Sequence, residues 1–239
     1  MTCVVGQRIA VTPFRKGFLN FRNRSLPLRT VRVILSRTTS SGQHSDMWQS
    51  VLDYWFSSGD RSKWFGGGPQ VDEEIKEKFG SLVDEAIQGN LKEWESEPRP
   101  SLALIILTDQ FTRNIYRNTA KAFAGDGRAL SVARKFIEGE THDHLDHSYA
   151  ERFFMNMPFL HSENLEDQEV SVKLASKLAE DSKGSEFEGM GKGVLDFATR
   201  HKEVIDKFGR YPQRNKSLGR ENTPEEEEFL KNVPDRYKW

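Results

Sequence analysis

The segment that decides the fold is Pro100–Arg117, which reads PSLALIILTDQFTRNIYR. Its first half, Leu102–Leu107, is apolar on every face of a helix, and a helix that is apolar all round is buried in a protein core. The apolar run is far shorter than the ~20 residues that a membrane-spanning helix needs. The segment therefore predicts a buried central helix against which other helices pack.

The chain from residue 46 onward repeats this helical spacing, and no alternating apolar and polar run of strand length interrupts it. Polar residues at Asp46, Ser148, Ser162 and Thr223 are suited to capping helix N-termini. We expect Pro158 to cut one helix short. The sequence predicts one all-α domain over residues 46–239 with about eight helices in antiparallel pairs. The expected helices lie near 47–56, 72–87, 100–117, 126–138, 149–157, after Ser162, 194–208 and after Thr223. A glycine-broken stretch precedes the helix 194–208, and Gly209 closes it.

The first 45 residues have a different composition, with eight basic residues and no Asp or Glu. An Arg-rich, Ser/Thr-rich stretch without acids is typical of a mitochondrial or plastid transit peptide. We expect residues 1–45 to be a disordered organelle-targeting leader, mitochondrial in preference to plastid. The alternative is a basic arm that stays attached, and translation from Met47 would give a cytosolic form.

Charge and cysteine content exclude several function classes for the expected domain. Removing the eight leader residues from the 35 basic residues of the chain leaves 27, against 36 acidic residues. A net acidic domain is a poor nucleic-acid binder, because phosphate neutralisation needs a positive field. Cys3 is the only cysteine, and the His-rich run His142–His147 lacks spaced ligands for a closed shell. We therefore expect no metal site and no cofactor.

A first polar cluster follows the apolar half of the central helix. Its members are Asp109, Gln110, Arg113 and Arg117, with Asn114 beside them. At 100° per residue, these four side chains continue the helix face on which Leu102 and Ile106 are expected to be buried. Buried guanidinium groups need carboxylates, phosphate or a bound anion as partners. The alternative is purely architectural, with an Asp109–Arg113 pair at i,i+4 and salt bridges between helices.

A second cluster lies at an expected corner between two helices and contains His161, Glu163 and Asp167. The free N–H groups of a helix N-terminus favour anions there. His161 is thus a candidate general acid or base, or an anion ligand. The alternative is a corner histidine that bonds a backbone carbonyl.

A third cluster follows the predicted helix 194–208 and contains His201, Arg210, Arg214 and Asn215. A tight loop that presents two arginines beside a neutral histidine suits a phosphate or carboxylate ligand. The alternative is a pair of ordinary surface arginines.

In these clusters the chain resembles the domain of unknown function 924 family. The matching motifs, all present in order, are DQFxRNxYR from Asp109, PFxHSE from Pro158, FGRxPxRN from Phe208 and GRxxTPEE from Gly219. The resemblance implies a helical fold similar to tetratricopeptide-like proteins, although the tetratricopeptide signature itself is absent. No activity is established for the family. Its bacterial members lack a leader, so the basic extension indicates a eukaryotic, organelle-directed member.

Two functions remain open at this point. In the first, a pocket binds a small phosphate- or carboxylate-bearing ligand through converging basic side chains, and Glu163 and Asp167 orient them. If chemistry occurs, His161 or His201 is the acid–base group for hydrolysis or isomerisation. In the second, the domain is a module that binds a partner protein, and the clusters are structural. Convergence of the three clusters on one cavity favours the first function.

Overall fold

The computed structural model describes residues 46–56, 61–65, 67–139 and 144–237, and every regular element within these ranges is helical. The predicted all-α class is therefore confirmed, whereas the predicted leader, residues 1–45, lies outside the described residues. The α-helices are α1 Met47–Phe56, α2 Gly68–Ile87, α3 Pro98–Ile105, α4 Thr112–Ile115, α5 Asp126–Ile137, α6 Tyr149–His161, α7 Leu165–Asp181, α8 Glu188–Phe208, α9 Asn215–Leu218 and α10 Pro224–Lys231.

The apolar segment Leu102–Leu107 is the centre of the fold, as predicted. All six residues of Leu102–Leu107 have no exposed surface. Helix α3 packs against α1, α5 and α6. Each large apolar side chain buried in this way contributes about 1.5–3 kcal/mol to folding. The central helix is not uniform, however, because a π-helical segment, Ile106–Phe111, joins α3 to α4.

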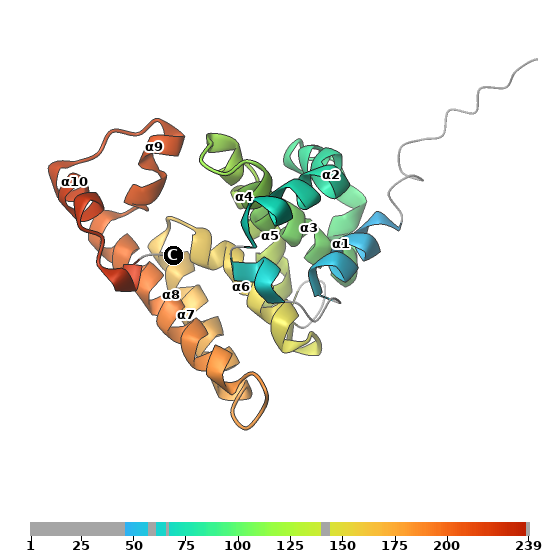
Figure 1. The fold of residues 1–239 in the computed structure, drawn as a ribbon. Helices are drawn as coiled ribbons and strands as arrows, with labels where there is room; N and C mark the ends of the chain where they lie inside the picture. Colours follow the sequence, from blue (N-terminus) through green and yellow to red (C-terminus); the bar gives the residue numbers. More distant parts are fainter. Residues whose placement is uncertain (1–45, 57–60, 66, 140–143, 238–239) are drawn as a thin grey trace, which may run out of the picture. The chain divides into compact units, whose positions relative to one another are not determined.

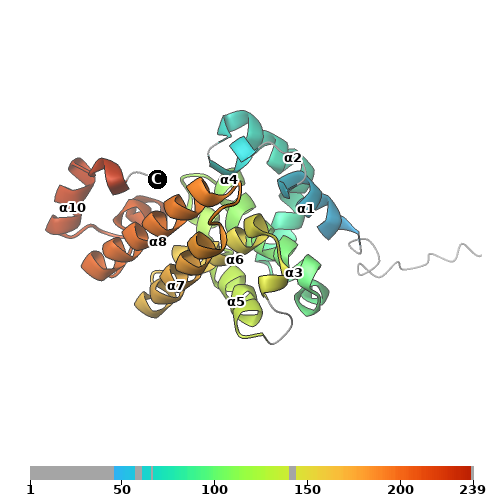
Figure 2. The same cartoon turned by 90° about the horizontal axis from the view of Figure 1, so that it is seen from below.

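Helices α6, α7 and α8 form a second layer, and α6 lies between α1–α5 and the α7–α8 pair (Figures 1 and 2). Helix α7 packs against both α6 and α8. The short connections 162–164 and 182–187 make successive helices antiparallel, so α6 and α8 run in the same direction. This parallel pair forms one wall of the candidate site. The tetratricopeptide-like arrangement of the whole stays a prediction.

The prediction that Pro158 ends a helix early is wrong. Helix α6 continues through Pro158 to His161. Proline removes one backbone hydrogen bond and strains the preceding turn, but only one further turn follows it. Burial of Phe159 and Leu160, each at most 1% exposed, offsets that cost. The extra turn gives His161 a fixed helical position.

Three predicted helix starts also need correction. Helix α7 is capped by Asn164, whose Oδ1 accepts hydrogen bonds from two backbone N–H groups, and not by Ser162. Helix α8 begins at Glu188 and includes glycines that were expected to break it. Helix α2 begins at Gly68, because Pro69 favours the first turn of a helix. The capping boxes at Ser148 and Thr223 are confirmed.

Within the described ranges, none of the helices combines the length and the apolar character that crossing a lipid bilayer requires.

Candidate functional site

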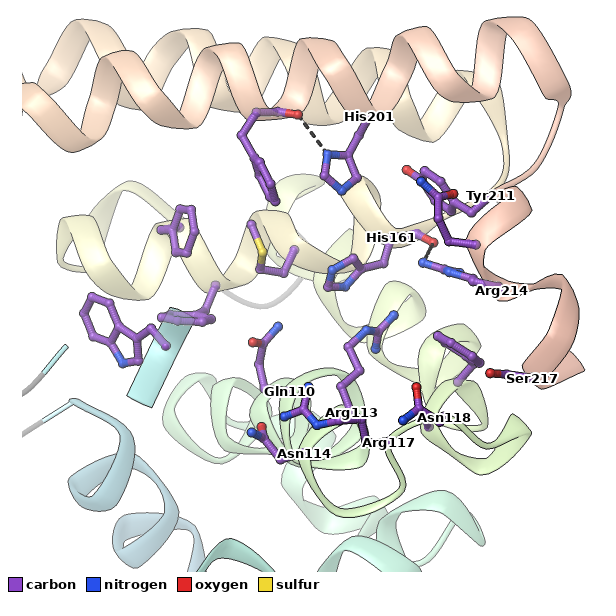
Figure 3. A pocket seen from close by; sticks show the side chains of 18 of the residues that line it. Gln110, Arg113, Asn114, Arg117, Asn118, His161, His201, Tyr211, Arg214 and Ser217 are labelled. Carbon is purple, nitrogen blue, oxygen red and sulfur yellow. Dashed lines mark hydrogen bonds between the residues drawn. The ribbon is translucent and has the colours of Figure 1, made fainter. Parts of the chain in front are cut away.

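A cavity of about 720 Å³ opens between residues 110–118, helix α6, helix α8 and residues 211–217 (Figure 3). Among the described residues, every charged side chain that lines the cavity is basic: Lys63, Arg113, Arg117, Arg200 and Arg214. Carboxylates pair with the four arginines, and none of these carboxylates is among the lining residues. The positive ends of several ion pairs therefore face the cavity.

The π-helical segment positions the carboxylate nearest the centre of the site. Its wider turn places Asp109 inward, fully buried, with Oδ1 2.7 Å from Nδ1 of His161. Gln110 donates a side-chain hydrogen bond to the other carboxylate oxygen. Insertions of this kind recur at functional sites because they re-aim side chains within a helix. The chain thus uses an irregular turn to place an acid against a histidine.

Two opposing effects set the charge of this pair. Burial opposes ionisation of Asp109, but the neighbouring His161 and Arg113 hold the pKa of the carboxyl below its ordinary value. For His161, burial and the charge of Arg113 lower the imidazole pKa, although Asp109 opposes them. At neutral pH Asp109 is therefore ionised and His161 is neutral. The carboxylate can only accept, so Nδ1 of His161 carries the proton and Nε2 carries a lone pair.

Two arginines that approach one carboxylate form the neighbouring wall of the cavity. Arg113 makes a bidentate ion pair with Asp126, with both N···O distances 2.9 Å. Arg214 approaches the same carboxylate at 3.5 Å and donates to the backbone oxygen of His161 at 2.9 Å. Both guanidinium groups lie over the ring of Phe123. Burial and the charge of Arg113 lower the pKa of Arg214.

Close backbone contact brings Asp126 to this place. A Cβ on the buried Gly125 would lie only 2.2 Å from the carbonyl oxygen of Thr108. Only glycine permits this approach without a shift of the backbone. The start of α5 can therefore lie directly against the π-helical segment.

His201 lies on helix α8 and also lines the cavity (Figure 3). Its Nδ1 is 2.9 Å from the carbonyl oxygen of Phe197, so this nitrogen carries the proton. Burial lowers the pKa of His201 to about 3, with His161 and Arg214 adding to the effect. His201 is a neutral, structurally anchored side chain on the cavity wall.

Arg117 and Asn114 occupy the rim and share one acid from helix α2. Asp72 accepts hydrogen bonds from Arg117 at 2.8 to 3.0 Å and from Asn114 at 2.7 Å. The Arg117 side chain is 52% exposed, in contrast to the 21% of Arg113. Arg117 is therefore available to a ligand mainly at the entrance.

Five predicted ligand residues do not line the cavity: Asp109, which is fully buried beside His161, and Glu163, Asp167, Arg210 and Asn215. Arg210 pairs with Glu226 at 2.6 and 2.7 Å, which places it outside the site. Asn215 bonds the side chains of Asn222, Glu226 and Arg220. These bonds hold the C-terminal segment together, and the structure places Arg210 and Asn215 away from the cavity.

Glu163 and Asp167 were expected to orient the histidines or arginines of the site, but in the structure they bond other groups. Glu163 accepts hydrogen bonds from Arg220 and from the backbone N–H of Tyr211. Asp167 pairs with Arg134 and accepts from the Ser162 hydroxyl. Asp109 performs the orienting role for His161, which the sequence left unassigned because the two residues are 52 positions apart.

Several residues of the site were not singled out from the sequence. Asp126, which pairs with two lining arginines, resembled an ordinary acid in the first turn of a helix, where the helix dipole favours it. No distinguishing local pattern marked three residues that line the cavity, Phe123, Phe197 and Arg200, and only the packing of separate elements brings them there. The described residues contain no group of three potential metal ligands, while His142 and Asp143 lie outside them.

Comparison with known proteins agrees with the motif resemblance. The family model described as "Bacterial protein of unknown function (DUF924)" matches residues 51–233. A solved structure of a protein of unknown function from Agrobacterium tumefaciens is similar to the chain, with 30% sequence identity and a TM-score of 0.66. The match covers 78% of this chain and 98% of that one. No protein with a curated description matches. The motifs, the helical fold and the family match agree, and the chain belongs to the DUF924 family.

Proposed function

We propose that the cavity binds a small organic anion through a carboxylate or phosphate group, and that His161 is the acid–base group acting on it. The observation that carries this proposal is the separation of charge around the cavity. Basic side chains line it, whereas Asp109 is fully buried and neither Asp72 nor Asp126 is among the lining residues. An anion in the cavity would meet guanidinium groups before it met any carboxylate.

The hydrogen bonds of Arg214 support the same proposal. A guanidinium has five N–H donors, and Arg214 uses two in side-chain hydrogen bonds, one of them the 3.5 Å contact with Asp126. Burial and the neighbouring charge of Arg113 disfavour its cationic form, so the pKa of Arg214 is lowered. A bound anion would accept from the remaining donors and relieve the repulsion between the two arginines.

His161 is suited to moving a proton in such a complex. Its neutral ring offers Nε2 on the edge opposite the Asp109 contact, and the ring lines the cavity. A proton taken from the ligand, or from a water beside it, would convert the ring to an imidazolium that Asp109 stabilises. The arginines would hold negative charge that develops on the ligand at the same time.

An architectural role alone predicts a different outcome. In that interpretation the pairs Arg113–Asp109, Arg113–Asp126 and Arg117–Asp72 serve only to hold helices together. These ion pairs give the arginines hydrogen-bond partners, but they do not require an open cavity with a basic wall. Whether an anion raises the melting temperature of the protein therefore separates the two roles.

The test is thermal unfolding of the full chain with increasing sodium phosphate or sodium acetate, against sodium chloride at equal ionic strength. We expect a saturable rise in melting temperature that chloride does not give, since ligand at ~100 times its Kd adds ~2.7 kcal/mol to stability. Arg113→Gln and Arg214→Gln should lose the response. Arg128→Gln is the matched control, because this similarly buried arginine pairs with Glu95 and does not line the cavity, and it should keep the response.

Arg214→Lys controls for loss of response through poor folding. Lysine keeps the positive charge but cannot make the bidentate hydrogen bonds of a guanidinium. This variant should give a weaker but measurable response. No response to either anion in the wild type, together with destabilised Arg113 and Arg214 variants, would assign the arginines a structural role and favour a protein partner.

A further inference from the structure

The side chains of helix α6 that line the cavity change from apolar to polar along the helix. Phe153, Met157 and His161 are spaced at i, i+4 and i+8 and all line the cavity. Residues at this spacing lie on one face of a helix. With a rise of 1.5 Å per residue, Phe153 and His161 are separated by about 12 Å along the axis. This face begins apolar and ends at the acid–base histidine.

Helix α8 repeats this order in the same direction. Phe197 precedes His201 by one turn, and both line the cavity. Because α6 and α8 run parallel, the apolar side chain precedes the histidine on both helices. His161 and His201 are close enough for the charge of one to affect the pKa of the other. The two helices therefore make a trough with an apolar end and a polar end.

Aromatic side chains from three elements close the apolar end. The Phe154 ring lies 5.4 Å from that of Trp55, 5.2 Å from that of Trp64 and 5.0 Å from that of Phe153. These residues all line the cavity. Lys63 also lines it, but its ammonium lies 4.0 Å from the centroid of the Tyr54 ring.

Two basic groups, Arg113 and Arg214, lie at the opposite end, whereas the Arg200 guanidinium lies 5.6 Å from the centroid of the Phe197 ring. Arg113 and Arg214 share Asp126, and Arg214 bonds the backbone of His161. The close view shows Arg214 approaching His161 from the loop after α8 (Figure 3). A bare inorganic anion at this end would leave the aromatic end filled by water or empty. A ligand that matches both ends has a charged head and an apolar tail.

We propose that the ligand is an organic acid with an acyl or aryl tail, its anionic group at Arg113, Arg214 and His161 and its tail along Met157 and Phe197. This inference rests on the proposed function of the same site and specifies its ligand class. Burial of each methylene from water strengthens binding about fourfold. Affinity is accordingly expected to rise with tail length until the trough is filled.

The test is calorimetric titration of the full chain with straight-chain carboxylates from acetate to octanoate. The wild type should show a gain approaching fourfold per methylene, followed by a plateau. Phe197→Ala should reduce the gain per methylene. Phe208→Ala is the matched control, because this phenylalanine on the same helix packs against Phe229 and does not line the cavity; its gain should equal that of the wild type.

The outcomes separate this inference from the proposed function. Equal affinities for acetate and octanoate, with binding that still needs Arg214, would overturn the ligand class and leave the anion site standing. A length dependence unchanged in Phe197→Ala would place the tail elsewhere and also overturn the inference. Absence of binding by every acid would overturn both.

Discussion

At the scale of single residues, His161 and His201 share a cavity but differ in what holds them. The first donates from Nδ1 to an ionised carboxylate, the second to a backbone carbonyl. A carboxylate stabilises an imidazolium far better than a carbonyl does. His161 can therefore gain and release a proton, whereas His201 stays neutral. Their different partners assign the acid–base role to His161.

The sequence identified both histidines as candidates but could not distinguish them. The helical spacing placed Asp109 next to Arg113, and that pair is present at 3.2 Å. The contact between Asp109 and His161 depends on the packing of α6 against the central helix, which no local pattern encodes. The same limit explains why Arg210 was grouped with Arg214, although the two side chains face different partners.

His201 leads to a prediction about stability and pH. Its pKa is lowered by burial to about 3 in the folded chain, against about 6.5 in an unfolded one. Between these values the unfolded state binds more protons, so the free energy of unfolding falls as the pH falls. Between pH 7.5 and 5.5 this single group should cost roughly 1 kcal/mol of stability.

Urea unfolding of the wild type and of His201→Gln at those two pH values measures this effect. The variant should lose less stability than the wild type on acidification. It should keep part of the dependence, because the pKa of His161 is lowered as well. Equal losses in the two proteins would contradict the buried, neutral state of His201.

At the scale of helices, hydrophobic periodicity predicted the elements well and their ends less well. The buried run Leu102–Leu107 and the capping boxes are local signals, and the structure contains both. Continuation of α6 through Pro158 depends on burial of the residues beyond it, which is a tertiary effect. The π-helical segment likewise has no single-sequence signal, although it places the acid of the site.

Two glycines of α8 provide a matched prediction about helix packing. A Cβ at Gly191 would lie 2.0 Å from Oγ and 2.9 Å from Cβ of Ser182 on the α7 side, whereas one at Gly193 meets nothing within 4 Å. Gly193→Ala should stabilise the protein by about 0.5–1 kcal/mol, because alanine restricts the unfolded chain and favours helix. Gly191→Ala should destabilise it by about 1–3 kcal/mol through overpacking.

Denaturant midpoints of these two variants and the wild type are the measurement. A shift of the same sign in both would mean that α7 and α8 do not approach as closely at Ser182 as the structure has them.

At the scale of the whole molecule, the fold brings some members of the three polar clusters to one cavity and places the other members away from it. Arg113, His161, His201 and Arg214 meet at the cavity. Glu163 of the second cluster and Arg210 of the third instead secure the C-terminal segment that carries Arg214, and Asp167 pairs with Arg134. The sequence left convergence or dispersal of the clusters open, and which members meet depends on which carboxylate each arginine reaches. The organelle-targeting role of residues 1–45 stays a prediction.

The measurement that tests the central claim most directly is a nuclear magnetic resonance titration of the isotope-labelled full chain with octanoate. Side-chain signals of arginine and histidine report where the acid binds. The account predicts saturable shifts for Arg113, Arg214 and the His161 ring, with Arg210 and Arg134 unchanged. Shifts confined to arginines outside the cavity, or none at a saturating concentration, would contradict the assignment of this cavity as an anion site.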